Sequence, residues 1–64
     1  MSEREEKLER MLSDIQSEYT ATLCKLEKLK QENKTKTATY KQLLGNKLML
    51  HDLLYRFKIY GLLD

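Results

Sequence analysis

Apolar side chains recur along this chain in alternating steps of four and three residues, and this repeat constrains the fold more than any other feature of the sequence. Such steps define a heptad, whose a and d positions face a partner helix in a coiled coil. An amphipathic helix that packs on a globular core follows a period of about 3.6 residues and drifts out of a strict heptad. The unbroken phase over seven heptads therefore predicts a coiled coil.

We name the apolar and amide members of the a and d positions the seam. They are Leu8, Leu12, Ile15, Tyr19, Leu26, Leu29, Asn33, Tyr40, Leu43, Leu50, Leu54 and Phe57, while Thr22, Lys36 and Lys47 fill the remaining a and d positions. The expected fold is all-α: one long continuous helix that forms a parallel homo-oligomeric coiled coil and broadens into a bundle at its C-terminal end.

Size also points to assembly. The chain has 64 residues, enough for one domain at most, and a domain this small is only marginally stable unless disulfides, a metal or oligomerisation help. Cys24 is the only cysteine, so an intramolecular disulfide is excluded. Cys24 and His51 lie far apart in sequence, whereas structural zinc needs four ligands in close pairs. We therefore expect no metal and no cofactor, and oligomerisation as the source of stability.

Composition divides the single domain, residues 1–64, into three parts. A charged heptad segment covers 3–32, a weak polar segment with three threonines covers 33–39, and an apolar segment covers 40–63. Ser2 and Glu5 form a capping-box pattern, which predicts that helix begins at about residue 3. The preserved heptad phase and the lack of Gly or Pro in the polar segment favour one continuous helix. The alternative is an antiparallel helical hairpin with a loop near 33–39.

Asn33 occupies an a position of the seam. There it could pair with its copy across a parallel dimer, which would fix the register, or it could begin a loop. The segment LEKLKQENK, residues 26–34, resembles leucine-zipper sequence, in which Asn recurs at a positions. The resemblance implies a parallel pair of helices. It implies no DNA binding, because the preceding segment is acidic overall rather than basic.

Beyond residue 43 a second apolar face joins the seam. We expect it to be a surface for a partner or for further helices, formed by Leu44, Leu48, Leu53, Tyr55, Ile59, Tyr60 and Leu62. A two-stranded coiled coil covers only its a and d positions, so this wider arc needs another cover. Further helices of the same chain type or a different protein would both serve.

Charge is distributed unevenly along the chain. Residues 1–32 hold six basic and eight acidic side chains, and residues 33–64 hold six and two. The basic half raises the alternative of binding to nucleic acid or to an anionic membrane surface. However, its basic residues are interspersed with leucines and the total charge is only +2, so we favour a solvated helix exterior and expect neither partner.

No arrangement of residues indicates an enzyme. His51, Asp52 and Tyr55 are neighbours on one predicted helix, without a glycine loop, a nucleophile-bearing turn or a cleft. The highly charged start is unlike a secretion signal, and charges interrupt the C-terminal apolar run before it could span a bilayer. We expect an intracellular scaffolding coiled coil, in cytoplasm or nucleus, that mediates oligomerisation and docks a protein partner.

Overall fold

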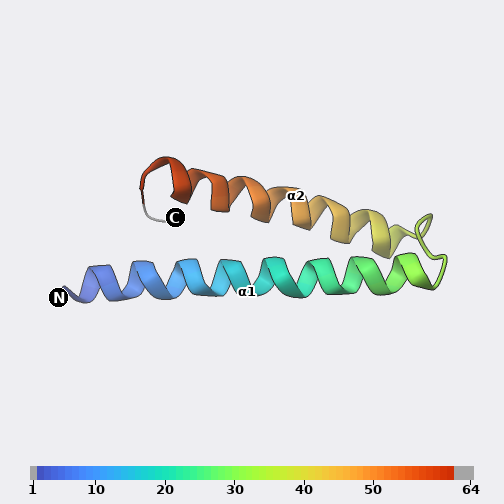
Figure 1. The fold of residues 1–64 in the computed structure, drawn as a ribbon, viewed down its shortest axis with the longest axis horizontal. Helices are drawn as coiled ribbons and strands as arrows, with labels where there is room; N and C mark the ends of the chain where they lie inside the picture. Colours follow the sequence, from blue (N-terminus) through green and yellow to red (C-terminus); the bar gives the residue numbers. More distant parts are fainter. Residues whose placement is uncertain (1, 62–64) are drawn as a thin grey trace.

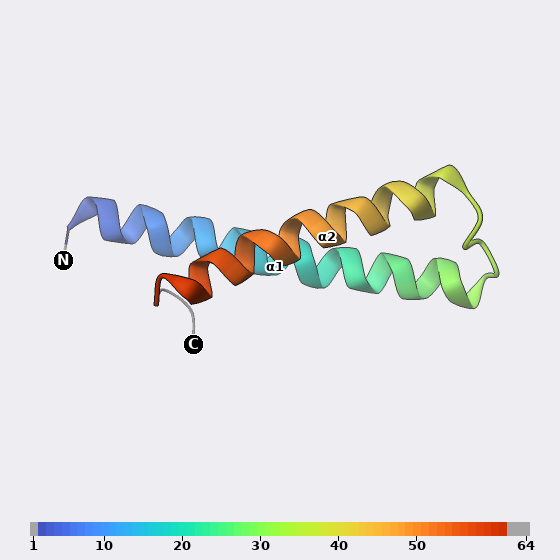
Figure 2. The same ribbon diagram turned by 90° about the horizontal axis from the view of Figure 1, so that it is seen from above.

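The chain folds into two α helices that lie side by side in opposite directions. The computed structural model describes residues 2–61, in which α1 covers Glu3–Gln31 and α2 covers Ala38–Ile59, with no strand among these residues. The described hairpin measures 47 × 18 × 18 Å. The first turns of α1 extend past the end of α2 (Figure 1), and α2 crosses α1 at a shallow angle (Figure 2).

The expectation of one continuous helix is wrong, and the alternative hairpin describes the chain. The connection covers residues 32–37, slightly before the polar segment 33–39 where the loop was predicted. Asn33 lies in this connection and is exposed, which agrees with the alternative that it begins a loop and not with its place in a parallel seam. Both helices still turn their a and d positions toward each other, since antiparallel helices also pack through these positions.

The end of α1 is stabilised by hydrogen bonds from the connection. Asn33 has a φ of 59°, in the left-handed region that Asn tolerates better than most residues. The Lys34 amide donates to the Leu29 carbonyl at 2.8 Å, and the Asn33 amide donates to the Lys30 carbonyl at 3.1 Å. These two bonds form a Schellman motif, with Asn in the place usually held by Gly. The turn therefore needs neither Gly nor Pro.

Thr37 starts α2. Its hydroxyl accepts from the Tyr40 amide at 3.1 Å and donates to the Lys34 carbonyl at 2.8 Å. The first bond is an N-cap, which satisfies one of the free amides of the first turn, and the second ties the cap to the connection. Threonine, a weak helix former in the middle of a helix, thus serves here to end one helix and begin the next.

The start of α1 agrees with its sequence pattern. The helix begins at Glu3, and the Ser2 hydroxyl accepts from the Glu5 amide at 3.2 Å, which confirms the predicted cap. Lys7 and Glu3 form an ion pair at 3.6 Å, but both side chains are largely exposed, so the pair contributes little.

The core is a thin layer between the two helices. Ile15 and Leu26 of α1 and Leu50 of α2 are the buried apolar side chains, and Thr22 is buried beside them. The Thr22 hydroxyl donates to the Glu18 carbonyl at 2.8 Å, which satisfies its polar group inside this layer. Neither helix of the described residues combines the length and the apolar character needed to cross a membrane.

Candidate interaction surface

Most seam residues meet one another within a single chain. Half-buried side chains surround the core layer, and they are Leu12, Tyr19 and Leu29 from α1 and Tyr40, Leu43, Leu54 and Phe57 from α2. Leu8 is 38% exposed, near the end of α2. Most seam residues are thus covered when the chain folds back on itself. Contact between seams of separate chains remains a prediction.

The second apolar face of α2 is turned mostly away from α1, although Leu44 at its start borders Leu23 and Lys30 of α1. Four of its residues form what we name the outer stripe: Leu44, Leu48, Tyr55 and Ile59, which are 38%, 62%, 56% and 62% exposed. At about 100° per residue they fall within an arc of about 60°, centred about 150° around the helix from the buried Leu50. α2 is therefore apolar on two nearly opposite sides, and only one of these sides has a neighbour in the hairpin.

Two other residues predicted for this surface lie elsewhere. Leu53 is half-buried and lines a shallow groove between the helices together with Ile15 and Leu50. Tyr60, 79% exposed, is the C-cap residue of α2 and falls outside the arc of the outer stripe. Leu62 lies outside the described residues.

Two exposed methionines were missed by the sequence analysis. Met11 of α1 and Met49 of α2 are 51% and 56% exposed, and both line the groove that contains Leu53. Met11 precedes an a position and Met49 precedes a d position, so neither belongs to the seam. Their proximity depends on the direction of the fold-back, which no signal within either helix reveals.

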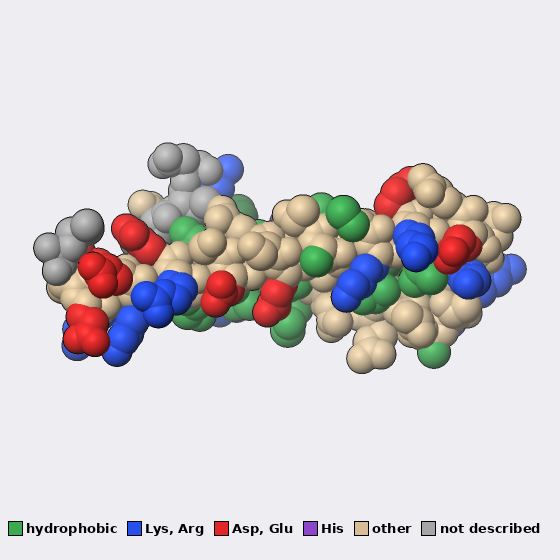
Figure 3. All heavy atoms as spheres, turned by 90° about the horizontal axis from the view of Figure 1, so that it is seen from below, with side chains coloured by type: hydrophobic (Ala, Val, Ile, Leu, Met, Phe, Trp, Pro, Cys, Tyr) green, Lys and Arg blue, Asp and Glu red, His purple; other side chains and the backbone are tan. Residues whose placement is uncertain are grey.

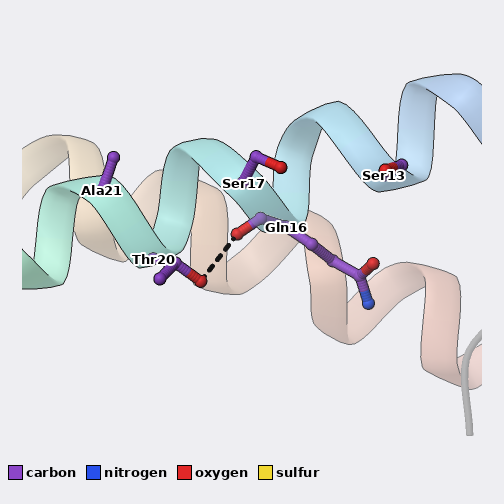
Figure 4. A pocket seen from close by; sticks show the side chains of 5 residues that line it. All are labelled: Ser13, Gln16, Ser17, Thr20 and Ala21. Carbon is purple, nitrogen blue, oxygen red and sulfur yellow. Dashed lines mark hydrogen bonds between the residues drawn. The ribbon is translucent and has the colours of Figure 1, made fainter.

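The side of α1 turned away from α2 is polar. Small and uncharged residues occupy its middle turns (Figure 4), and they are Ser13, Gln16, Ser17, Thr20 and Ala21. The Thr20 hydroxyl donates to the Gln16 carbonyl at 3.1 Å, so this hydroxyl is satisfied within the helix. Cys24 is exposed on the same helix. The five residues line a shallow depression, and none of their side chains is an acid, a base or a thiol.

Charged side chains of opposite sign predominate at opposite ends of the hairpin. Acidic groups predominate toward the N-terminal end of α1, and lysines predominate toward the connection (Figure 3). Within α2, Arg56 and Asp52 form an ion pair at 3.4 Å with both side chains mostly exposed. Among the described residues, no three potential metal ligands come together.

Comparison of the chain with protein-family models, with curated proteins and with solved structures gives no match.

Proposed function

We propose that this chain is an assembly module, a helical hairpin that binds other helices through the outer stripe of α2. The exposure of the outer stripe carries the proposal. Two of its members, Leu48 and Ile59, are each 62% exposed, while Leu50 of the same helix is 4% exposed. Apolar side chains in helical register on a side without a neighbour are typical of a helix-binding surface.

The energetics support the same function. Full burial of one Leu, Ile or aromatic side chain contributes about 1.5–3 kcal/mol, so covering the outer stripe contributes several kcal/mol. Within residues 2–61 the hairpin by itself buries only three apolar side chains. A chain of this size has a small margin of stability, and covering the stripe would raise it substantially. We propose scaffolding, with a partner protein or further copies as the bound helices, and no catalytic role.

Light scattering on the wild type and two double variants tests this function. Leu48→Glu with Tyr55→Glu places two charges on the outer stripe, whereas Ser13→Glu with Ser17→Glu places two charges on the polar side of α1. We expect the wild type and the control to exceed the monomer mass of 7.7 kDa, and the stripe variant to fall to it. Burying unpaired charges in an apolar interface costs several kcal/mol. A stripe variant with unchanged mass and unchanged melting temperature would overturn the proposal.

A second candidate function is binding to an anionic membrane surface. The observation that favours it is the composition of α2, which carries four basic side chains against the single acid Asp52 and also presents the outer stripe. A basic amphipathic helix with an exposed apolar side is typical of interfacial binding. Duplex DNA would exploit the same positive charge without using the stripe.

A further inference from the structure

We propose that the partner of the outer stripe is the outer stripe of a second copy of this chain, bound in the antiparallel direction around a two-fold axis between His51 and Asp52. This inference rests on the proposed function and specifies its partner. The two α2 helices would lie at the centre of the dimer and the two α1 helices on its outside.

The spacing of the outer stripe is the first observation behind this pairing. Its four members, Leu44, Leu48, Tyr55 and Ile59, are separated by four, seven and four residues, a spacing that reads the same in both directions. The numbers 44 and 59, and likewise 48 and 55, share one midpoint between residues 51 and 52. An antiparallel two-fold at this midpoint therefore brings every member opposite another member, so the surface is self-complementary.

The contacts that result are all apolar. Leu48 lies level with Tyr55 of the partner subunit, and Leu44 lies level with Ile59 of the partner subunit, each contact occurring twice. At about 1.5 Å per residue the stripe runs for about 22 Å, roughly four turns of helix. A parallel pair in register would instead place each member level with its own copy, so the direction of the pair depends on the charges at the two ends of the hairpin.

The residues at the middle of the outer stripe allow the two α2 helices to approach each other closely at the two-fold axis. His51 and Asp52 sit about 50° to either side of the centre of the stripe, so they border the contact line and do not fill it. The axis brings each of them near its own copy. The ion pair between Asp52 and Arg56, at 3.4 Å, offsets the repulsion of the two carboxylates, and His51 packs beside Tyr19 of its own chain.

The axial charge distribution is the second, independent observation. Residues 25–47, which form the connection end of the hairpin, hold seven lysines and two glutamates, a net charge of +5. Residues 2–24 carry a net charge of −3 and residues 48–61 carry +1, so the opposite end is at −2. An antiparallel dimer places the positive end of one copy beside the negative end of the other. A parallel dimer would place +5 beside +5, so charge selects the antiparallel direction.

Disulfide cross-linking maps the register. The exposed Cys24 is first changed to Ser, and single cysteines are then introduced by Leu48→Cys in one sample and Tyr55→Cys in another. A disulfide requires Cα atoms about 4.4–6.8 Å apart. In the proposed dimer two copies of residue 48 are separated by about 10 Å along the axis, whereas residue 48 lies level with the partner's residue 55.

We expect a disulfide-linked band at twice 7.7 kDa when the two samples are mixed under mild oxidation, and none from either sample alone. Leu44→Cys mixed with Ile59→Cys gives the same result and serves as an independent pair. Leu48→Cys mixed with Ser17→Cys is the negative control. Self-linking of Leu48→Cys without linking to Tyr55→Cys would indicate a parallel pair and overturn the inference.

Different results would overturn the assembly function and the two-fold pairing of the outer stripe. A wild type that is larger than a monomer and is dissociated by Leu48→Glu with Tyr55→Glu, yet shows no 48-to-55 linkage, keeps the assembly function and overturns the two-fold pairing. A wild type that stays at 7.7 kDa at millimolar concentration also overturns the pairing with a second copy. A wild type that is larger than a monomer and keeps its mass in the stripe variant overturns both.

Discussion

The ring of Tyr19 in α1 lies beside the imidazole of His51 in α2, with ring centroids 6.2 Å apart and planes tilted by 46°. This separation and tilt are typical of favourable contacts between planar rings. The two residues are 32 positions apart in sequence, and only the fold-back brings them together within the chain. The contact joins Tyr19, which is half-buried at the edge of the core layer, to the exposed His51 of the other helix.

Two leucines of α2 should respond very differently to truncation. Leu50 is 4% exposed and Leu48 is 62% exposed, so they differ in burial and not in chemistry. Leu50→Ala should lower the free energy of unfolding by about 2–5 kcal/mol, because it leaves a cavity between the helices. Leu48→Ala, measured at concentrations where the chain is monomeric, should change it by less than about 0.5 kcal/mol. Urea denaturation checks both, and equal losses would contradict the assignment of the two sides of α2.

Substitution of Asn33 tests the turn. Its φ of 59° suits Gly, whereas a β-branched residue is strained there. Asn33→Gly should keep or slightly raise the thermal midpoint, and Asn33→Val should lower the stability by about 1–2 kcal/mol. If the valine variant were as stable as the glycine variant, residue 33 would not adopt the left-handed conformation and the chain would not turn at this point.

The cap of α2 can be tested through a single hydroxyl. Thr37→Ala removes the acceptor for the Tyr40 amide and the donor to the Lys34 carbonyl, and it should cost about 1 kcal/mol. Thr37→Ser keeps the hydroxyl and should retain most of the stability. Circular dichroism melts of the two variants provide the comparison. A serine variant that loses as much as the alanine variant would show that the methyl group, and not the hydroxyl, matters at this position.

The sequence anticipated part of this fold. The heptad positions predicted which side chains turn toward another helix, and Ile15, Leu26 and Leu50 are indeed the buried apolar residues. The repeat could not tell whether the facing helix belongs to the same chain, since parallel oligomers and antiparallel hairpins both use a and d positions. The absence of Gly and Pro from the polar segment did not exclude a turn there. Asn33 adopts the left-handed backbone conformation that Gly usually provides at such a turn.

The candidate surface was anticipated less completely. Helical arithmetic separates Leu44, Leu48, Tyr55 and Ile59 from the seam, and these four are exposed as a set. The predicted surface also included Leu53, which lies about 150° from the centre of the stripe and borders the groove between the helices. Which flank of α2 is covered depends on how α1 crosses it, and that is a property of tertiary packing that local pattern does not encode.

Vesicle binding separates the assembly function from the membrane-surface candidate. We expect no salt-sensitive co-sedimentation with vesicles that contain anionic lipid, because the outer stripe is occupied by helices in the assembled state. Zwitterionic vesicles of the same size are the control. Tight binding to anionic vesicles that weakens as salt is raised would favour the membrane candidate, since surface attraction of basic side chains is screened within about 10 Å at 0.1 M salt.

A single intramolecular distance tests the fold-back of the chain, on which both proposals depend. Glu9→Cys and Lys58→Cys, with Cys24 changed to Ser, place spin labels on α1 and α2 near the groove where Glu9, Phe57 and Gly61 meet. Labelled protein is diluted with unlabelled protein so that pulsed electron paramagnetic resonance reports distances within one chain. The hairpin predicts a separation below about 30 Å, because packed helix axes are about 8–10 Å apart. A separation of about 70 Å, the span of one continuous helix between these residues, would contradict it.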